Sequence, residues 1–322
     1  MKTSIKIKKY LKEKNRVTGS ELSNYLGIGN RAVRKQLANL LRNGEIDKIG
    51  RPPKVFYLLK SSVEEKEDVV INKKRKEIIE KNYLIITPSG EKKDGFAGFN
   101  YWCNKNNLDV SKTADEYIKV LNKYDKFKRG GLIDGLQKFN STFSRVYIDK
   151  IFYLDFYSIE RFGKTRLGQL LLYGKQSGNK VIIKQIVAEI KPKIDSLIKK
   201  FRIDAVGFIP WTVKREVQFI RELEKQLNLN VKSIKIEKIK TEIIVPQKTL
   251  SKLEDRIENA GKTLVLTESG KYNNLLLIDD AVGSGATLNQ VAKQVKDKKI
   301  AKNVIGISIT GSFKGFDVIS EV

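Results

Sequence analysis

The stretch LLLIDDAVGSGATL, residues 275–288, decides the fold of the second half of the chain. Its four aliphatic residues, 275–278, form an unbroken apolar run, which predicts a strand buried on both faces of a sheet. Asp279 and Asp280 follow where this strand should leave the sheet. Small residues then form a tight loop, and Thr287 can cap a helix whose apolar residues recur at helical spacing. We therefore expect a strand, a loop and a helix in succession, with two acids at the strand end.

This layout suits a phosphate attached to a sugar. The loop and the start of the helix present backbone N–H groups and the positive end of the helix dipole, and both favour a phosphate. The two acids cannot favour that phosphate, but their oxygens can accept hydrogen bonds from sugar hydroxyls. No lysine follows the glycines, so the stretch is not a nucleotide-binding P-loop. The residues expected to form the site are Asp279, Asp280, Ala281, Val282, Gly283, Ser284, Gly285, Ala286 and Thr287.

Residues 275–287 resemble the signature of type I phosphoribosyltransferases for phosphoribosyl pyrophosphate (PRPP). In that signature a hydrophobic strand and two acids precede a Thr-Thr-Gly-x-Thr-like loop, whereas this chain has Gly283 and Ser284 where two threonines are common. The resemblance implies that the acids hold the ribose hydroxyls, that the loop holds the 5-phosphate, and that Mg²⁺ arrives with PRPP without direct protein ligands. The alternative is an ordinary strand–turn–helix of an α/β sheet.

The rest of residues 146–322 predicts an α/β domain with a mostly parallel sheet flanked by helices. Strands are expected at 151–156, 205–209, 231–239 and 304–310, and helices at 181–201 and 213–227. Ligands of such sheets bind at the carboxyl ends of the strands. Pro210 and Asp279 both lie at such ends, so we expect them to be close together.

The same region resembles the ComF-like branch of the phosphoribosyltransferases, the family of a DNA-uptake competence protein. Ile209-Pro210 with the basic pair after it is similar to the Val-Pro strand end and Arg-containing segment of that branch. A Lys-x-x-Gly turn ending at Gly178 and a Gln-x-x-Leu…Arg…Asn segment from Gln247 to Asn259 also match. The resemblance implies a pyrophosphate side formed by Pro210, Trp211, Lys214, Arg215 and Lys175.

This part of the resemblance has alternatives and departures. Lys214 and Arg215 can equally form a solvated helix face, and Gln247, Arg256 and Asn259 can belong to a surface loop and helix. Glu216 stands where a Gly-Phe-Asn sequence is common. The branch usually begins with a four-cysteine zinc module, which this chain lacks.

The first 60 residues predict a small domain of three helices and two strands. A helix is expected at 1–15, a short helix ended by Gly27, a third helix opened by Asn30, and two strands within 45–60 whose tip is 50–54. This order resembles the winged helix-turn-helix of bacterial transcriptional regulators. The segment holds fifteen basic and four acidic residues, a formal charge of +11 out of +26 for the chain.

Such a clustered positive charge suits contacts to DNA phosphates. The resemblance implies that the third helix enters the major groove and that the tip between the strands meets the backbone or the minor groove. The alternative is a winged helix used for protein contacts. The residues implied to bind double-stranded DNA are Asn30, Arg31, Arg34, Lys35, Arg51 and Lys54.

Residues 61–145 are expected to form a helical connector without chemistry of its own. Glu and Lys dominate 61–81, which predicts a linker or an exposed helix. The aromatic-rich segment 95–102 can stack on bases, but packing is the simpler interpretation. Thr113 and Glu116 predict a capping box at the start of a helix.

Composition excludes several classes of site. The chain has 322 residues, one cysteine (Cys103) and no histidine, which rules out internal disulfides, Cys/His zinc sites and His-based catalytic triads. No long apolar run or signal peptide is apparent, so we expect a cytoplasmic protein without a membrane partner. A composition rich in lysine and acidic residues can also reflect a low-GC genome.

Three functions follow from these patterns. The first is a DNA-binding regulator whose second domain senses PRPP or a nucleotide; the purine-operon repressor of bacteria combines the same two fold types. The second is a phosphoribosyltransferase that releases pyrophosphate from PRPP. The third is a ComF-like accessory protein that handles DNA. A homodimer is expected, since dimers are common in both families.

Overall fold

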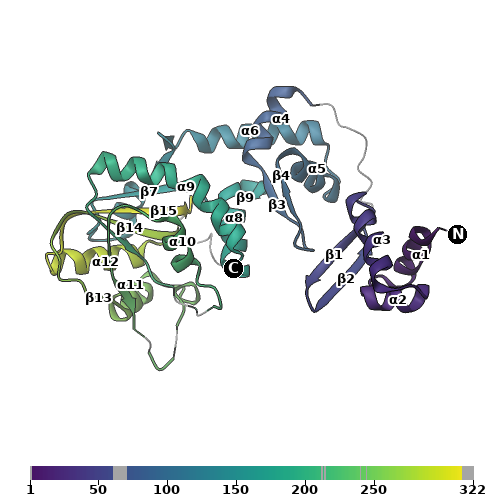
Figure 1. Cartoon of the computed structure of the whole chain (residues 1–322). Coiled ribbons are helices and arrows are strands. Elements are labelled where there is room, and N and C mark those ends of the chain that lie inside the picture. The colour runs from purple at the N-terminus through teal and green to yellow at the C-terminus, as the bar shows by residue number, and fades with distance from the viewer. Residues whose placement is uncertain are drawn as a thin grey trace. The chain divides into compact units, whose positions relative to one another are not determined.

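The computed structural model describes residues 2–60, 71–211, 213, 215–239, 241–243 and 245–313, without the side chains of Arg51 and Lys248. The chain divides into two compact units, Met1–Asp68 and Val69–Val322 (Figure 1). None of the helices in these described ranges is both long and apolar enough to span a lipid bilayer.

The N-terminal unit has three helices followed by a two-stranded antiparallel sheet. The elements are α1 (Thr3–Lys14), α2 (Gly19–Leu26), α3 (Asn30–Arg42), β1 (Ile46–Arg51) and β2 (Lys54–Leu59). Thr18 and Glu21 form a capping box at the start of α2, and Gly27 ends that helix in the left-handed conformation that glycine tolerates best. A small apolar core joins the elements, formed by Ile7, Leu11, Val17, Leu22, Val33, Leu37, Leu40 and Ile46.

The second unit is built on a seven-stranded sheet. Its strand order is β11 (Lys232–Ile234), β10 (Ala205–Phe208), β14 (Tyr272–Val282), β15 (Ala301–Gly311), β7 (Lys150–Phe156), β6 (Leu132–Asp134) and β5 (Lys128–Arg129). The first five strands are parallel, and β6 and β5 add an antiparallel edge. The predicted α/β class with a mostly parallel sheet is therefore confirmed.

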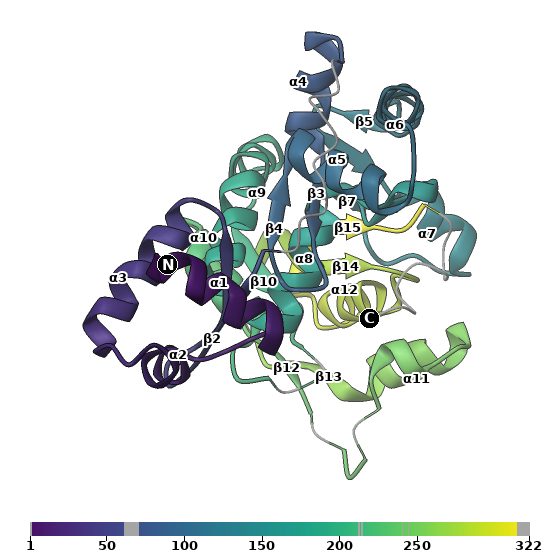
Figure 2. The ribbon, with the colours of Figure 1, turned by 90° about the vertical axis from the view of Figure 1, so that its right-hand side faces the viewer.

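Helices cover both faces of this sheet (Figure 2). On one face α8 (Arg166–Ser177), α9 (Lys180–Phe201) and α10 (Phe219–Leu227) share one apolar core with the sheet. On the other face α7 (Leu136–Thr142), α11 (Leu253–Thr263) and α12 (Ala286–Asp297) share a second core. The central strands β14 and β15 are buried between these layers, as their continuous apolar runs predict.

Residues 71–145, expected as a connector, belong to the second unit. They form α4 (Lys73–Asn82), β3 (Leu84–Ile86), β4 (Lys92–Asp94), α5 (Gly95–Lys105), α6 (Val110–Asp125), β5, β6 and α7. The strands β5 and β6 extend the main sheet, although two and three residues are too short to show a strand pattern in the sequence. The aromatic residues Tyr83, Phe99, Trp102 and Tyr117 of this part pack on one another and on Phe162.

Two expected boundaries in the second unit are wrong. The helix predicted to start with a capping box at Thr113 begins at Val110, because the Asp109 carboxylate caps it by accepting from the Lys112 N–H at 2.7 Å. The single strand expected at 231–239 is two strands. After β11, β12 (Ile236–Lys238) leaves the main sheet and pairs with β13 (Leu264–Leu266). Two further short strands, β8 (Ser158–Ile159) and β9 (Gly163–Lys164), form a hairpin.

Candidate functional site

The two acids lie within β14 and not beyond its end. Pairing with β15 continues past the apolar run, with Asp279 opposite Ser308 and Ala281 opposite Thr310. The predicted strand end at residue 278 is therefore four residues short, because β15 is as long as β14 and supports it to Val282. Successive side chains of a strand point to opposite faces, so Asp279 and Asp280 occupy different surroundings.

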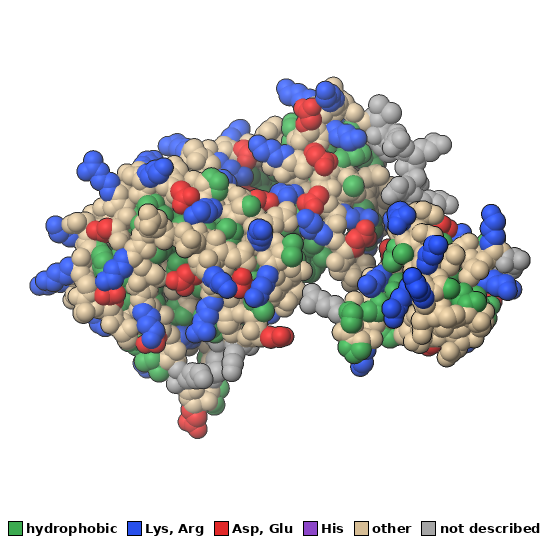
Figure 3. Space-filling model, in the orientation of Figure 1, with side chains coloured by type: hydrophobic (Ala, Val, Ile, Leu, Met, Phe, Trp, Pro, Cys, Tyr) green, Lys and Arg blue, Asp and Glu red, His purple; other side chains and the backbone are tan. Residues whose placement is uncertain are grey.

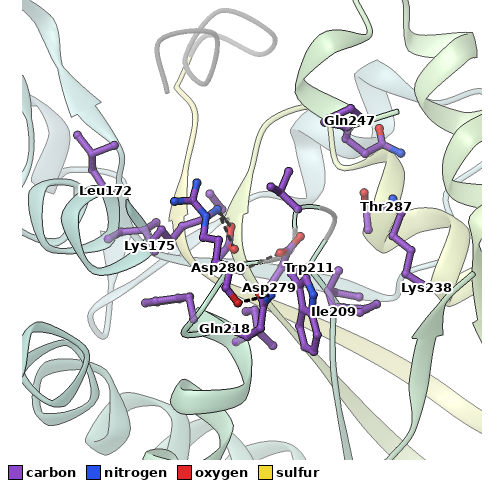
Figure 4. Close-up of a pocket in the computed structure, with 18 of the residues that line it drawn as sticks. Leu172, Lys175, Ile209, Trp211, Gln218, Lys238, Gln247, Asp279, Asp280 and Thr287 are labelled. Carbon is purple, nitrogen blue, oxygen red and sulfur yellow. Dashed lines mark hydrogen bonds and ion pairs between the residues drawn. The ribbon is translucent and has the colours of Figure 1, made fainter. Parts of the chain in front are cut away.

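Asp280 is bound to Lys175. The Lys175 ammonium lies 2.9 Å from both carboxylate oxygens, and the two side chains are 33% and 17% exposed. Lys175 belongs to the last turn of α8, which continues to Ser177. The prediction of a Lys-x-x-Gly turn is therefore wrong for Lys175. The helix ends at Gly178, whose φ of 60° is left-handed. Two elements far apart in sequence, α8 and β14, thus bring a cation and a carboxylate together at the carboxyl edge of the sheet (Figure 4).

The Asp279 carboxyl group, in contrast, lies in surroundings that disfavour its charge. Although the residue is partly exposed, its carboxyl group is enclosed by protein, and one oxygen accepts from the Asp280 backbone N–H at 2.7 Å. Burial and the adjacent negative charge of Asp280 raise the pKa of Asp279 to about 8. Asp279 therefore resists ionisation, while the Asp280 carboxyl group lies against the Lys175 ammonium. Carboxyl groups with a perturbed pKa beside a charged partner are typical of functional sites.

The loop after β14 leads directly into α12. The cap of α12 is Gly285, with a left-handed φ of 85°, and the predicted capping role of Thr287 is wrong because Thr287 lies inside the first turn. A Cβ at Gly285 would lie 2.3 Å from the Phe139 ring, so only glycine fits there. The first turn of a helix has N–H groups without helical partners, and these can bind an anion.

A pocket of about 240 Å³ opens over this edge of the sheet. Eight of the residues expected to form the site line it: Lys175, Pro210, Trp211, Arg215, Asp279, Asp280, Ala281 and Thr287. Val282 is buried in the core. The other expected residues of the loop adjoin the pocket but are not among the described residues that line it. They are Gly283, Ser284, Gly285 and Ala286.

Some of the residues expected on the pyrophosphate side lie together at the pocket. Pro210 and Trp211 follow β10, and the Arg221 guanidinium lies 4.7 Å from the centre of the Trp211 ring. The predicted helix 213–227 begins only at Phe219, so Arg215 lies in a non-helical segment, where it donates to the Gln176 carbonyl at 3.4 Å. Lys214 lies outside the described residues.

Two pocket residues were not predicted from the sequence. Lys238 comes from β12, lines the pocket together with Thr287, and has a pKa lowered by burial. Gln218 precedes α10 on the side of Lys175. Lys238 is one of 63 basic residues, and only the pairing of β12 with β13 places it here, so no local signal marks it.

The segment from Gln247 to Asn259, which matches Gln-x-x-Leu…Arg…Asn, is held together by hydrogen bonds between its own residues. Gln247 lines the pocket, and its amide donates to the Asn259 side-chain oxygen at 3.1 Å and to the Arg256 carbonyl at 3.0 Å. The Arg256 guanidinium donates to the Leu250 carbonyl at 2.7 Å. Of this group, Gln247 faces the site and the others hold the segment in place.

The candidate ligands for a metal ion at this site are two carboxyl groups. No group of three or more His, Cys, Asp or Glu side chains converges in the described parts of the chain. Asp279 and Asp280 are the two acids in the pocket, and Asp280 is engaged by Lys175. The expectation that Mg²⁺ comes with PRPP, without direct protein ligands, stays a prediction.

In the N-terminal unit the residues expected to bind DNA are exposed. Asn30, Arg31, Arg34 and Lys35 are exposed on α3, whereas Val33, Leu37 and Leu40 of the same helix are buried, and Lys54 is exposed at the start of β2. Arg31 and Lys35 are four residues apart and therefore share a helix face. Arg51 is the last residue of β1, and the structure does not describe its side chain. Basic side chains gather over this unit in Figure 3.

Comparison with known proteins finds only weak similarity, all of it to solved structures. No family model and no curated protein sequence matches the chain. Among solved structures, a hypoxanthine-guanine phosphoribosyltransferase from Bacillus anthracis is 15% identical with a TM-score of 0.28, covering 44% of this chain and 73% of that one. A hypoxanthine phosphoribosyl transferase from Trypanosoma cruzi is 14% identical with a TM-score of 0.28, covering 42% and 68%. Such values are too low to decide the family or the function.

Proposed function

We propose that this chain is a DNA-binding regulator whose second unit binds PRPP or a nucleotide. The observation that supports the ligand is the pocket at the ends of β10 and β14, where Asp279 has a raised pKa, Asp280 pairs with Lys175 and the first turn of α12 is adjacent. Few other ligands need hydroxyl-binding carboxylates and an anion-binding helix start side by side.

Each group of the ligand has a matching group in the site. Asp280 accepts from a ribose hydroxyl, and Asp279, whose pKa is raised, can donate to or accept from the neighbouring hydroxyl. The 5-phosphate lies on the loop 283–287 at the start of α12. Lys175 and Arg215 supply positive charge for a diphosphate, and Lys238 adds charge from the opposite wall beside Thr287 (Figure 4).

The N-terminal unit is proposed to be a winged helix-turn-helix. Its three helices and β hairpin occur in the required order, α3 has four exposed polar or basic residues, and the net charge of its first 60 residues is +11. Phosphates of duplex DNA favour such a surface, and a helix of this kind fits the major groove. The alternative use, contact with another protein, does not need so many uncompensated cations.

Regulation requires that the ligand and the DNA each bind one conformation of the protein more tightly than another. The two binding events are then linked by a coupling free energy, and each alters the affinity of the other by the same factor. The chain is proposed to act as a homodimer, which would match a DNA site with two-fold symmetry.

Turnover is the second candidate function, and it is favoured by the cations on the diphosphate side of the pocket. In an active phosphoribosyltransferase the bond from ribose C1 to the pyrophosphate oxygen breaks, and a bond from C1 to the acceptor forms. Lys175 and Arg215 would stabilise the charge that develops on the departing pyrophosphate. Bound Mg²⁺ would supply further charge neutralisation for the same oxygens.

One experiment separates these functions. The full-length protein is mixed with genomic DNA fragments, and the protected sequences are mapped by footprinting with and without PRPP and Mg²⁺. A regulator gives a footprint that shifts with PRPP while no pyrophosphate is released over a panel of bases. Pyrophosphate release with one base favours the enzyme, and preference for single-stranded over duplex DNA favours the ComF-like accessory role. An absence of any DNA binding would contradict the proposal.

A further inference from the structure

Lys138 lies behind the loop that follows β14. It belongs to α7, and its ammonium donates to the carbonyl oxygens of Gly283 at 2.8 Å and Ser312 at 3.2 Å. Gly283 directly follows β14, and Ser312 directly follows β15. One side chain therefore joins the two points at which the central parallel strands leave the sheet.

The Lys138 ammonium has no carboxylate partner among the residues that the structure describes. Burial alone lowers the pKa of Lys138 to about 8. Placing a cation in such surroundings costs free energy, and two neutral carbonyl groups offset it only in part. A costly group beside a candidate binding loop suggests a role other than stability.

The residue next to Lys138 also shapes the loop. Phe139 is fully buried, and its ring occupies the space that a side chain on Gly285 would need. Two consecutive residues of α7 therefore contact two positions of the loop, Gly283 by hydrogen bonding and Gly285 by packing. The loop is fixed from the side of α7.

Peptide geometry connects this contact to anion binding. In a trans peptide the carbonyl of one residue and the N–H of the next point in opposite directions. A Gly283 carbonyl held toward Lys138 therefore turns the Ser284 N–H toward the other side of the loop. This N–H precedes the first turn of α12, where the Ala286 N–H donates to the Ser284 hydroxyl at 3.3 Å and the next N–H groups lack helical partners. Together these donors form the kind of nest that binds a phosphate.

We propose that Lys138 is a positioning residue, which orients the peptide between Gly283 and Ser284 so that the loop can bind the 5-phosphate of the ligand. The inference rests on the proposed function, since it assumes that a phosphorylated sugar occupies the loop. Lys138 contacts the loop and does not contact the ligand. Its positive charge reaches the phosphate only through the intervening peptide.

The test compares three variants of the full-length protein. Lys138→Met keeps the length of the side chain without its donors, Lys138→Arg keeps a cationic donor, and Gln137→Met changes an exposed neighbour on the same helix. Hydrogen exchange is followed at the amides of residues 283–285, PRPP affinity is measured by calorimetry with Mg²⁺, and thermal melting shows that each variant is folded.

We expect Lys138→Met to speed exchange at these amides and to weaken PRPP binding about 10- to 100-fold, the range for loss of hydrogen bonds to a charged group. Lys138→Arg should restore most of the affinity, which a merely structural role would not require. Gln137→Met should behave as the natural protein.

Two results would overturn the inference while leaving the proposed function in place. One is unchanged exchange at residues 283–285 in Lys138→Met, and the other is unchanged PRPP affinity in a protein that otherwise binds PRPP. A natural protein that does not bind PRPP at all would overturn the proposed function and this inference together. The affinity of the natural protein thus separates the two failures.

Discussion

At the scale of single residues, the site depends on two adjacent carboxyl groups in different surroundings. Asp280 is neutralised by Lys175 across the sheet edge, and Asp279 is enclosed beside it. A carboxyl group whose pKa is raised can donate to a ribose hydroxyl, and the neighbouring Asp280 carboxyl oxygens can accept from one. The same arrangement makes the unliganded protein less stable than it could be, because an enclosed Asp resists ionisation.

The pH dependence of stability follows from the sign of this shift. The pKa of Asp279 is higher in the folded state, about 8, than in the unfolded state, for which 3.8 is the ordinary value. Between these values the folded state binds more protons, so stability falls as pH rises from about 4 to about 8. The slope from this group reaches at most about 1.4 kcal/mol per pH unit.

Asp279→Asn should remove that slope. We expect the variant to be more stable than the natural protein at pH 8 and close to it at pH 4.5, as measured by urea unfolding at both values. Asp255→Asn, an exposed acid on α11, is the matched control and should leave the slope unchanged. Equal pH slopes for Asp279→Asn and the natural protein would contradict the raised pKa of Asp279.

Sequence reasoning found the residues that form a local motif and missed those placed by the fold. Asp279, Asp280 and Thr287 were predicted because they lie in one strand–loop–helix stretch, and all three line the pocket. Lys238 and Lys138 were not, since nothing in their neighbouring residues distinguishes them from other surface lysines. Their roles depend on β12 and α7, which are brought to the site only by tertiary packing.

At the scale of elements, tertiary partners set boundaries that local patterns missed. The apolar run predicted a strand of four residues, but pairing with β15 extends β14 through both acids. Amphipathic spacing predicted a helix from residue 213, yet α10 begins at Phe219. A hydrophobic period locates the middle of an element well, whereas its ends depend on caps and partners that lie elsewhere in the chain.

The close packing of α7 against the loop gives a direct test at this scale. Gly285→Ala would place a Cβ against the Phe139 ring and would keep a left-handed φ of 85°. We expect a loss of about 1–3 kcal/mol in the free energy of unfolding, from strain and overpacking together. Chemical denaturation measures this loss.

The matched control is Gly261→Ala in α11, where the nearest atom to a new Cβ is 3.5 Å away and φ is not left-handed. Alanine favours a helix over glycine, so this variant should be neutral or slightly more stable. If Gly285→Ala were as stable as the control, the close packing of α7 on the loop would be incorrect.

At the scale of the whole molecule, charge distinguishes the two units. The first 60 residues carry +11 of the +26, so the proposed interaction with DNA belongs to a small part of the chain. The alternation of strands and helices predicted the parallel sheet of the second unit. The edge strands β5 and β6 from residues 128–134 could not be predicted, because two or three residues show no period.

Binding to DNA should depend on the exposed face of α3. Arg31→Ala with Arg34→Ala should weaken duplex binding and should reduce the slope of log K against log salt by up to about 0.9 for each DNA phosphate that the variant no longer neutralises. Lys12→Ala with Lys14→Ala, two exposed cations of α1, is the matched control. Fluorescence anisotropy with full-length protein over a range of salt measures both. An equal loss of affinity in both pairs would indicate general attraction and not a recognition helix.

The central claim is that Asp279 and Asp280 with the loop after them bind a phosphorylated sugar. The most direct measurement is isothermal titration calorimetry of the full-length protein with PRPP and Mg²⁺. It is repeated on the double variant Asp279→Asn with Asp280→Asn and on the control variant Asp255→Asn. The account predicts one site per chain, binding weakened about 100-fold or more in the double variant, and no change in the control. Absence of binding to the natural protein, or undiminished binding to a folded double variant, would contradict it.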